Sequence, residues 1–273
     1  MIFEKIYLEE NNENVYLEAY VADKVGDYVR DAILVIPGGG YGNVCSDREG
    51  EPIAMAFMPH GFNAFVLHYS VTSKEKRSFP TQLIQASLAM KHIKDNAERY
   101  NINPERVFVT GFSAGGHLAA SLGILWHINE VYEAVDMPFG YNKPAGMMLN
   151  YPVITGSGKE YSHYGSFKNL FCTENVSDEQ LYRASLENHV DERSVPAFIF
   201  HTSTDKLVPV QSALRLADAY AEKRMPFELH IYPNGPHGMA LANEITSVGN
   251  RDFIDPAMEK WIENAVVWSK KIR

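Results

Sequence analysis

Short apolar runs recur along the chain and are separated by longer amphipathic segments. These runs occupy positions 32–36, 64–69, 107–110, 146–150, 197–201 and 227–232. Apolar runs of this length without polar alternation are typical of strands that are covered on both faces. Two earlier stretches, 2–8 and 14–21, alternate apolar and polar residues around a polar turn at 10–13. This alternation predicts an antiparallel pair of strands at the start of the chain.

Segments with helical periodicity lie between several of the apolar runs. The clearest are 80–99 and 210–223, where apolar residues recur every three or four positions. Strands that alternate with helices predict a mostly parallel, doubly wound sheet with right-handed crossovers. We therefore expect an α/β fold with an eight-stranded sheet and helices on both of its faces.

The organisation of the chain favours one domain. With 273 residues and 45% hydrophobic content, the chain can bury one substantial core, and no repeat or Pro/Ser-rich linker divides it. We expect a single domain over 1–273. Two irregular inserts, near 126–145 and 155–194, are rich in Tyr, Gly, His and Asn. Each insert either caps a binding cleft or forms a surface excursion, and the sequence leaves both open.

Charge and cysteine usage narrow the possible partners. The net charge is −9, and no run of Lys or Arg is long enough to follow a phosphate backbone, so we expect no nucleic-acid partner. Cys45 and Cys172 lack the spacing of a zinc site or a disulfide framework. The start of the chain does not resemble a secretory signal, and no apolar run approaches the roughly 18 residues that span a bilayer. We expect a cytoplasmic protein with no membrane partner.

The strongest chemical signal is the sequence G-x-S-x-G at positions 111–115, between the apolar run at 107–110 and a small-residue helical segment. In this context a serine occupies a sharp turn from strand to helix, and the glycines leave room for that turn. The hydroxyl group of Ser113 is then exposed at the sheet edge, near the positive end of a helix. Ser113 is the candidate nucleophile.

A serine nucleophile needs a general base and an acid that orients the base. In this type of fold the chain order is serine, acid, histidine, and only His230 and His237 follow every plausible acid. His230 falls inside a predicted strand, whereas His237 lies in a Gly- and Pro-containing loop, so His237 is the candidate base. Asp205 follows a predicted strand and is the candidate acid. It also fits a simple helix-capping role, which stays open.

Three consecutive glycines follow the apolar run that ends at position 36. Backbone N–H groups that stabilise an oxyanion must approach the substrate closely, which side chains would prevent. We expect Gly39, Gly40 and Ala114, the residue after the nucleophile, to supply these N–H groups.

Together these motifs resemble the α/β-hydrolase esterases known as acetyl-xylan or feruloyl esterase-like sugar esterases. The similarity extends through P-G-G-G-Y at 37–41, S-D-R-E-G-E-P at 46–52, G-F-S-A-G-G-H at 111–117 and G-P-H-G-M at 235–239. The resemblance implies a serine carboxylesterase that hydrolyses short acyl esters, especially acetyl esters, of sugars or related small alcohols. It also implies that the enzyme needs no cofactor and no metal.

Four further residues are candidates for substrate contact: Tyr41, Arg48, His163 and Ser166. Tyr41 follows the glycine loop, and Arg48 lies close behind it in the chain, although a solvent-exposed salt bridge is an alternative role for Arg48. His163 and Ser166 belong to the second insert. From these residue types we expect a cleft with polar and aromatic walls.

Two other functions fit the same motifs. An arylformamidase or a peptidase uses the same triad, but a propeller-bearing peptidase would show sequence repeats, which this chain lacks. A non-catalytic binding protein on the same fold usually loses a member of the triad, whereas here all three candidates are present.

Overall fold

The computed structural model describes residues 1–158 and 160–272. One eight-stranded sheet runs through the molecule in the order β1-β2-β4-β3-β5-β6-β7-β8. The first pair, β1 and β2, is antiparallel, β2 also runs antiparallel to β4, and all the other neighbours are parallel. The predicted fold class is therefore confirmed. The strands are β1 (Ile2–Tyr7), β2 (Tyr16–Val21), β3 (Arg30–Ile36), β4 (Phe62–His68), β5 (Ile102–Phe112), β6 (Met147–Asn150), β7 (Ala197–Thr202) and β8 (Phe227–Tyr232).

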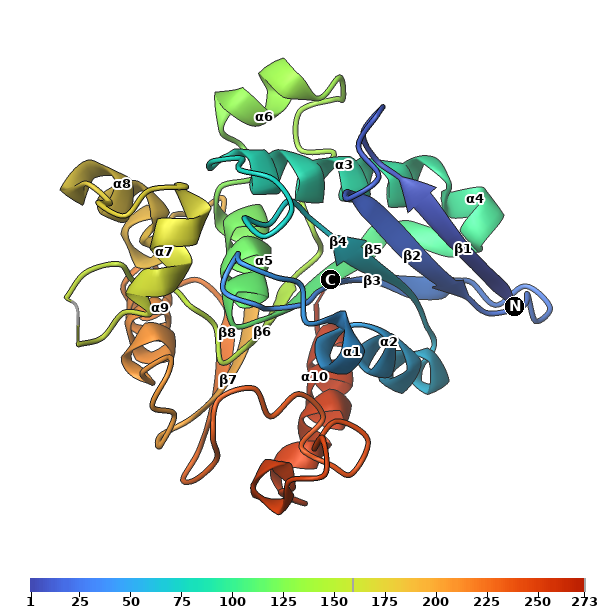
Figure 1. Cartoon of the computed structure of the whole chain (residues 1–273). Helices are drawn as coiled ribbons and strands as arrows, with labels where there is room; N and C mark the ends of the chain where they lie inside the picture. The colour runs from blue at the N-terminus through green and yellow to red at the C-terminus, as the bar shows by residue number, and fades with distance from the viewer. Residues whose placement is uncertain (159, 273) are drawn as a thin grey trace.

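Helices cover both faces of the sheet. Figure 1 shows α3, α4 and α5 on one side of the strands and α1, α2 and α10 on the other. The helices are α1 (Ser46–Glu49), α2 (Glu51–Phe57), α3 (Thr81–Asp95), α4 (Ala97–Tyr100), α5 (Ala114–Ile124), α6 (Asn129–Ala134), α7 (Tyr164–Leu170), α8 (Asp178–Ala184), α9 (Gln211–Glu222) and α10 (Trp261–Ser269). Short 3₁₀ turns lie at Met58–His60, Leu186–His189, Arg251–Phe253 and Met258–Lys260.

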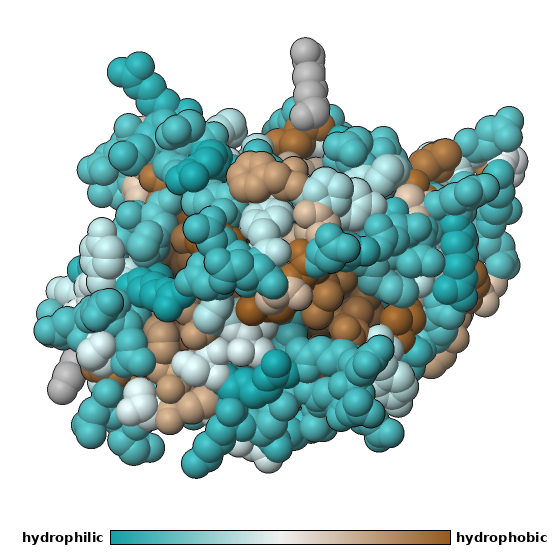
Figure 2. Space-filling model, turned by 90° about the horizontal axis from the view of Figure 1, so that it is seen from above, coloured by the Kyte–Doolittle hydropathy of each residue, from teal (hydrophilic) through white to brown (hydrophobic). Residues whose placement is uncertain are grey.

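The hydrophobic core consists of two layers separated by the sheet. Neighbouring residues of β3 point to opposite layers: Leu34 packs with α3 and α5, and Val35 packs with α2 and α10. Because both faces are buried, these strands carry the continuous apolar runs seen in the sequence. The surface seen from above is mostly hydrophilic, with smaller groups of apolar atoms between the polar side chains (Figure 2).

The structure differs from the sequence expectations in its helices. The single helix expected over 80–99 is divided into α3 and α4 at Asn96, whose side-chain amide donates a hydrogen bond to the His92 carbonyl at 2.8 Å. An Asn side chain that takes this carbonyl competes with the helical hydrogen-bond pattern. The first insert contains α6, and the second contains α7 and α8, although position 159 lies outside the described residues. None of the described helices has the length and apolar character needed to cross a bilayer.

Candidate active site

The turn from β5 into α5 places Ser113 at the carboxyl edge of the sheet. Ser113 has φ 53° and ψ −118°, a conformation that L-residues rarely adopt. A Cβ atom on Gly111 would come within 2.2 Å of the Gly115 carbonyl oxygen, and one on Gly115 would come within 2.2 Å of the Ile36 carbonyl oxygen. The two glycines of the motif are therefore required by close packing around the serine.

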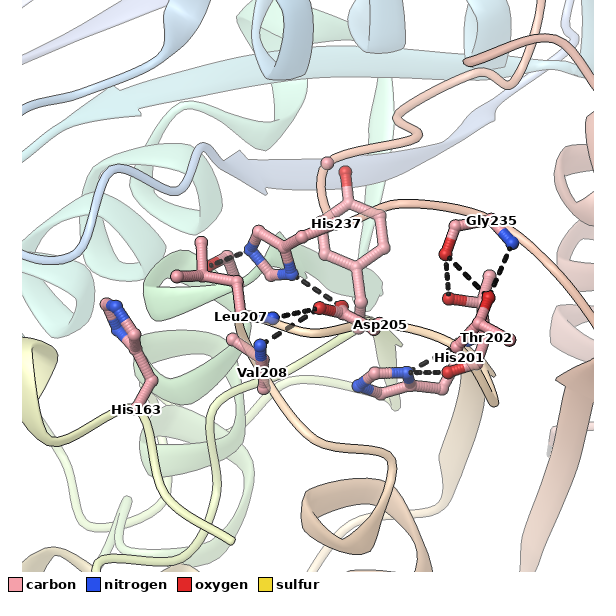
Figure 3. A network of polar contacts seen from close by, with 12 residues as sticks. His163, His201, Thr202, Asp205, Leu207, Val208, Gly235 and His237 are labelled. Atoms are coloured by element: carbon pink, nitrogen blue, oxygen red, sulfur yellow. Dashed lines mark hydrogen bonds and ion pairs between the residues drawn. The ribbon is translucent and has the colours of Figure 1, made fainter. Parts of the chain in front are cut away.

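Ser113, His237 and Asp205 lie in one hydrogen-bonded line. The Ser113 hydroxyl and His237 Nε2 are 2.8 Å apart, and His237 Nδ1 and Asp205 Oδ2 are 2.6 Å apart. Figure 3 shows the His237 ring beside Asp205, with a dashed line for the contact between them. With Nδ1–H donating to the carboxylate, Nε2 is free to accept the serine proton. The structure thus brings together the three residues that the sequence selected.

The two oxygens of the Asp205 carboxylate accept hydrogen bonds from different groups. Oδ1 accepts hydrogen bonds from the backbone N–H groups of Leu207 at 2.9 Å and Val208 at 3.0 Å, which leaves Oδ2 for His237. Burial alone would raise the pKa of Asp205, but the hydrogen bond and charge of His237, together with the Val208 N–H, lower it. The side chain orders the turn that precedes α9 and orients the histidine. It does not cap α9, whose N-cap position is Val210 and has no side-chain cap, so the helix-capping alternative is not found.

The glycine loop after β3 lies beside the serine. Gly39 has φ 123° and Gly40 has φ 62°, both in the region that favours glycine. Among the described residues, no acceptor is paired with the N–H groups of Gly39, Gly40 or Ala114. The Gly40 carbonyl accepts a hydrogen bond from the Asn169 amide at 2.8 Å, which fixes the loop from the side of α7. Unpaired N–H groups in a fixed loop can stabilise a developing oxyanion.

A cleft of about 370 Å³ opens over these groups. Its lining contains Ser113 and His237, and the glycine loop and the second insert contribute further residues. They are Gly39, Gly40, Gly42, Asn43, Cys45, Arg48, Glu49, Ser113, His163, Gly165, Asn169, Leu207, His237 and Gly238. The first insert contributes none of these residues. Polar side chains such as Asn43, Arg48 and Asn169 line the cleft, but no Tyr, Phe or Trp is among its described lining residues, so the expected aromatic walls are not found.

Two of the four substrate-contact candidates line the cleft. Arg48 donates a long hydrogen bond of 3.4 Å to the Gly238 carbonyl, and no described carboxylate forms an ion pair with it. His163 lies on the side of His237 away from Asp205 (Figure 3). Burial, and secondarily the charge of His237, lowers the pKa of His163, so its ring favours the neutral form.

The other two candidates are buried away from the cleft. Tyr41 is 2% exposed, and its hydroxyl donates to His117 Nδ1 at 2.8 Å. The left-handed backbone at Tyr41, with φ 57°, turns the side chain inward. Ser166 is 1% exposed and its hydroxyl pairs with His163 Nδ1 at 2.8 Å. Neither side chain is placed to contact a substrate directly, which corrects the sequence expectation for both.

Sequence reasoning missed three residues that hold the site: Asn169, Glu49 and Tyr151. Asn169 fixes the glycine loop, as described above. Glu49 accepts a hydrogen bond from the Gly38 N–H at 2.8 Å and another from the Tyr151 hydroxyl at 2.8 Å. Glu49 belongs to the S-D-R-E-G-E-P stretch on which the family resemblance partly rests, and Tyr151 begins the Y-P-V-I-T stretch at 151–155 that belongs to the same resemblance; these two stretches were the available signals.

The fold and the arrangement of these residues define an α/β-hydrolase. A family model, BD-FAE, matches residues 17–220, and the chain belongs to the BD-FAE family. Over 225 residues it is 40% identical to endo-1,4-beta-xylanase B of Butyrivibrio fibrisolvens, covering 80% of this chain and 34% of the xylanase. It is 30% identical to the acetylxylan esterase of Xylanibacter ruminicola, covering 77% of this chain and 41% of the esterase. The chain thus spans about a third to two fifths of the length of these two relatives.

A solved structure resembles the chain over nearly its full length. It is the acetyl ester-xyloside bifunctional hydrolase from Caldicellulosiruptor lactoaceticus, with a TM-score of 0.83 and 32% identity. The alignment covers 98% of this chain and 96% of that one. The comparisons confirm the family resemblance seen in the sequence, and the names of these relatives agree with the expected class of carboxylic ester hydrolase.

Proposed function

We propose that this protein is a serine carboxylesterase that removes short acyl groups, chiefly acetyl, from sugars or related small alcohols. The observation that carries the proposal is the hydrogen-bonded line from Ser113 through His237 to Asp205, which opens into a cleft beside the glycine loop. The relatives named xylanase, acetylxylan esterase and acetyl ester-xyloside hydrolase support a sugar ester as substrate.

The residues present suffice for a two-step mechanism. Ser113 Oγ attacks the ester carbonyl carbon while His237 Nε2 takes its proton. The carbonyl oxygen becomes an oxyanion near the N–H groups of Gly39, Gly40 and Ala114. Collapse expels the alcohol, which takes the proton from His237, and leaves an acyl group on Ser113. A water molecule, deprotonated by His237, then releases the acid and restores the serine.

Arg48 and His163 are proposed to contact the alcohol portion of the substrate, because both line the same cleft as the serine. The second insert would then form one wall of the site within a single catalytic domain over 1–273. No step needs a cofactor or a metal ion, and we expect EDTA to leave the rate unchanged. The proposed partner is a small ester, not a nucleic acid or a membrane.

The acyl-chain preference tests this proposal. The cleft offers Leu207 as its one large aliphatic side chain among the described lining residues. Each methylene that found a matching apolar slot would contribute about 0.8 kcal/mol. We expect kcat/KM for p-nitrophenyl esters to be highest with acetate and to fall steeply by octanoate, with deacetylation of acetylated xylo-oligosaccharides in parallel. An enzyme that prefers octanoate, or that cleaves N-formyl aromatic amines faster than any ester, would contradict the sugar-ester assignment.

A further inference from the structure

The proposed reaction requires two loops to keep a fixed position relative to each other. The glycine loop at 37–40 supplies N–H groups, and the loop at 233–242 supplies His237. These loops are separated by nearly two hundred positions in the chain and belong to different strands of the sheet. An error of about 1 Å in such a constellation costs roughly a hundredfold in rate. Some contact must therefore fix one loop relative to the other.

A chain of three hydrogen bonds connects the two loops through Glu49. The Gly38 N–H donates to Glu49 Oε2 at 2.8 Å, and the Tyr151 hydroxyl donates to Glu49 Oε1 at 2.8 Å. The Ala240 N–H then donates to the Tyr151 hydroxyl oxygen at 2.9 Å. Both carboxylate oxygens and the tyrosine hydroxyl are thus used, and the connection runs from one loop to the other without a gap.

The tyrosine in this chain also contacts the base itself. The rings of Tyr151 and His237 meet edge to face, with centroids 5.1 Å apart. Tyr151 and Ala240 both have left-handed backbones, with φ 38° and 50°. Such conformations persist where the surrounding contacts over-determine them. The strained positions therefore lie where the hydrogen-bond chain holds the histidine loop.

The glycine loop is shaped around the same carboxylate. A Cβ atom at position 38 would lie 2.8 Å from Glu49 Oε2 and 2.7 Å from the Phe112 carbonyl oxygen. Glycine is therefore required at position 38, because the carboxylate and the strand before the nucleophile both approach its backbone closely. On the other side of this loop, the Tyr69 hydroxyl donates to the Pro37 carbonyl at 2.8 Å.

Stability alone is a poor reason to bury Glu49. The residue is 2% exposed, and burial raises the pKa of its carboxyl group, while the Gly38 and Tyr151 hydrogen bonds act in the opposite direction. Removing a carboxylate from water is costly, and replacing buried charges by apolar side chains often leaves stability unchanged or improved. A buried charge that joins two functional loops is better explained by geometry than by stabilisation.

We propose that Glu49 is a positioning residue that couples the glycine loop to the loop carrying His237 through Tyr151. This inference rests on the proposed serine-esterase function. Glu49 is not expected to exchange a proton with the substrate. Its role is to hold the N–H groups of Gly39 and Gly40 in place relative to the imidazole while the oxyanion forms.

The decisive variants are Glu49→Gln and Tyr151→Phe, assayed with p-nitrophenyl acetate on the folded full chain. Loss of a single oxyanion donor costs about 100- to 1000-fold in kcat, and a displaced loop should cost less. We expect Glu49→Gln to lower kcat about 10- to 100-fold with KM within about twofold, and Tyr151→Phe to act in the same direction. Because both variants break one connection, we expect the double variant to lose far less than the product of the single losses.

Two matched controls separate positioning from stability. Asp31→Asn removes a carboxylate at the opposite end of β3, where Asp31 pairs with Arg106. Tyr220→Phe removes a buried tyrosine hydroxyl that donates to the Val195 carbonyl at 2.8 Å. Both controls should lower the melting temperature and keep the wild-type kcat.

The inference is overturned if Glu49→Gln and Tyr151→Phe behave like these controls, with wild-type kcat. If Glu49→Gln does not fold, Tyr151→Phe decides alone. Ser113→Ala separates the proposed function from the proposed role of Glu49. An active Ser113→Ala variant contradicts the proposed function. An inactive Ser113→Ala variant together with a fully active Glu49→Gln variant contradicts only the role of Glu49.

Discussion

The two ends of the parallel strands are built in contrasting ways. At the carboxyl ends lie Ser113 and Tyr151, both with positive φ, and the buried carboxylates of Glu49 and Asp205. At the amino ends, Arg106 binds both oxygens of Asp31 at 2.8 Å and also donates to the Ser269 and Ile272 carbonyls near the end of α10. This second cluster is partly exposed to solvent.

The two edges differ in whether strained backbone and buried charge occur together. At the carboxyl edge, where open α/β sheets bind ligands, strained backbone lies beside buried carboxylates, whereas Asn101 and Arg224 at the amino edge have positive φ without such a carboxylate among the described residues. The amino edge carries the partly exposed ion pair of Asp31 and Arg106, and Arg106 also connects the sheet to the residues near the end of α10. Substitutions at the first edge should therefore change the chemistry, whereas similar substitutions at the second should change stability alone.

The largest expected effect comes from Ser113→Ala. Removal of a triad nucleophile typically lowers kcat about a million-fold. The melting temperature should change little, since a methyl group fits where the hydroxymethyl group was. Steady-state hydrolysis of p-nitrophenyl acetate measures the loss. Ser212→Ala is the matched control and should keep full activity, because Ser212 is buried in α9 and its hydroxyl has no hydrogen-bond partner among the described residues.

Asp205→Asn should have the next largest effect. The amide can still accept the Leu207 and Val208 N–H groups, but its NH₂ group favours the wrong tautomer of His237. We expect kcat to fall about ten-thousand-fold with the fold intact. The same chemical change at the amino edge, Asp31→Asn, should leave kcat unchanged. Equal losses in the two variants would contradict the contrast between the edges.

The smallest expected effect is on how the free energy of unfolding depends on pH, through two buried histidines near the carboxyl edge. Burial lowers the pKa of His117 and of His201 to about 4, from an ordinary value of 6.5. Below pH 6.5 the unfolded chain therefore binds protons that the folded chain does not accept until about pH 4. The free energy of unfolding should fall through this window as pH falls, by up to about 3 kcal/mol for each histidine.

Urea titrations at several pH values measure this effect. His117→Gln removes one of the two groups, so its unfolding free energy should depend less steeply on pH than that of the wild type. Replacement of His60, an exposed histidine, is the control. An unchanged slope in His117→Gln would show that this buried ring does not contribute to acid destabilisation.

The sequence predicted the parts of this molecule that depend on local patterns or chain order. The central strands were recognisable because burial on both faces requires continuous apolar runs, and β1 and β2 were recognisable from alternation; β8, expected to be covered on both faces, is only partly buried. Ser113, Asp205 and His237 followed from the turn motif and from the order of residues along the chain. Helix α10 was not predicted, because its nine residues, Trp261–Ser269, are apolar on most sides and give a weak periodic signal.

The sequence could not reveal contacts between distant segments. Glu49 resembles an ordinary surface residue of a short charged helix, and only the approach of Gly38 and Tyr151 shows that it is buried. Tyr41 was expected at the cleft because it follows three glycines. Its inward direction depends on a left-handed backbone and on a partner, His117, that lies far along the chain in α5.

The central claim is that Ser113 carries the acyl group during turnover. Rapid quenching of the wild-type enzyme with p-nitrophenyl acetate, followed by mass spectrometry of its peptides, tests it directly. We predict a burst of p-nitrophenol and one acetyl group on the peptide that contains Ser113, and we expect neither in Ser113→Ala. Turnover without any acetylated intermediate, or a kinetically competent acetyl group on another residue such as Cys45, would contradict it.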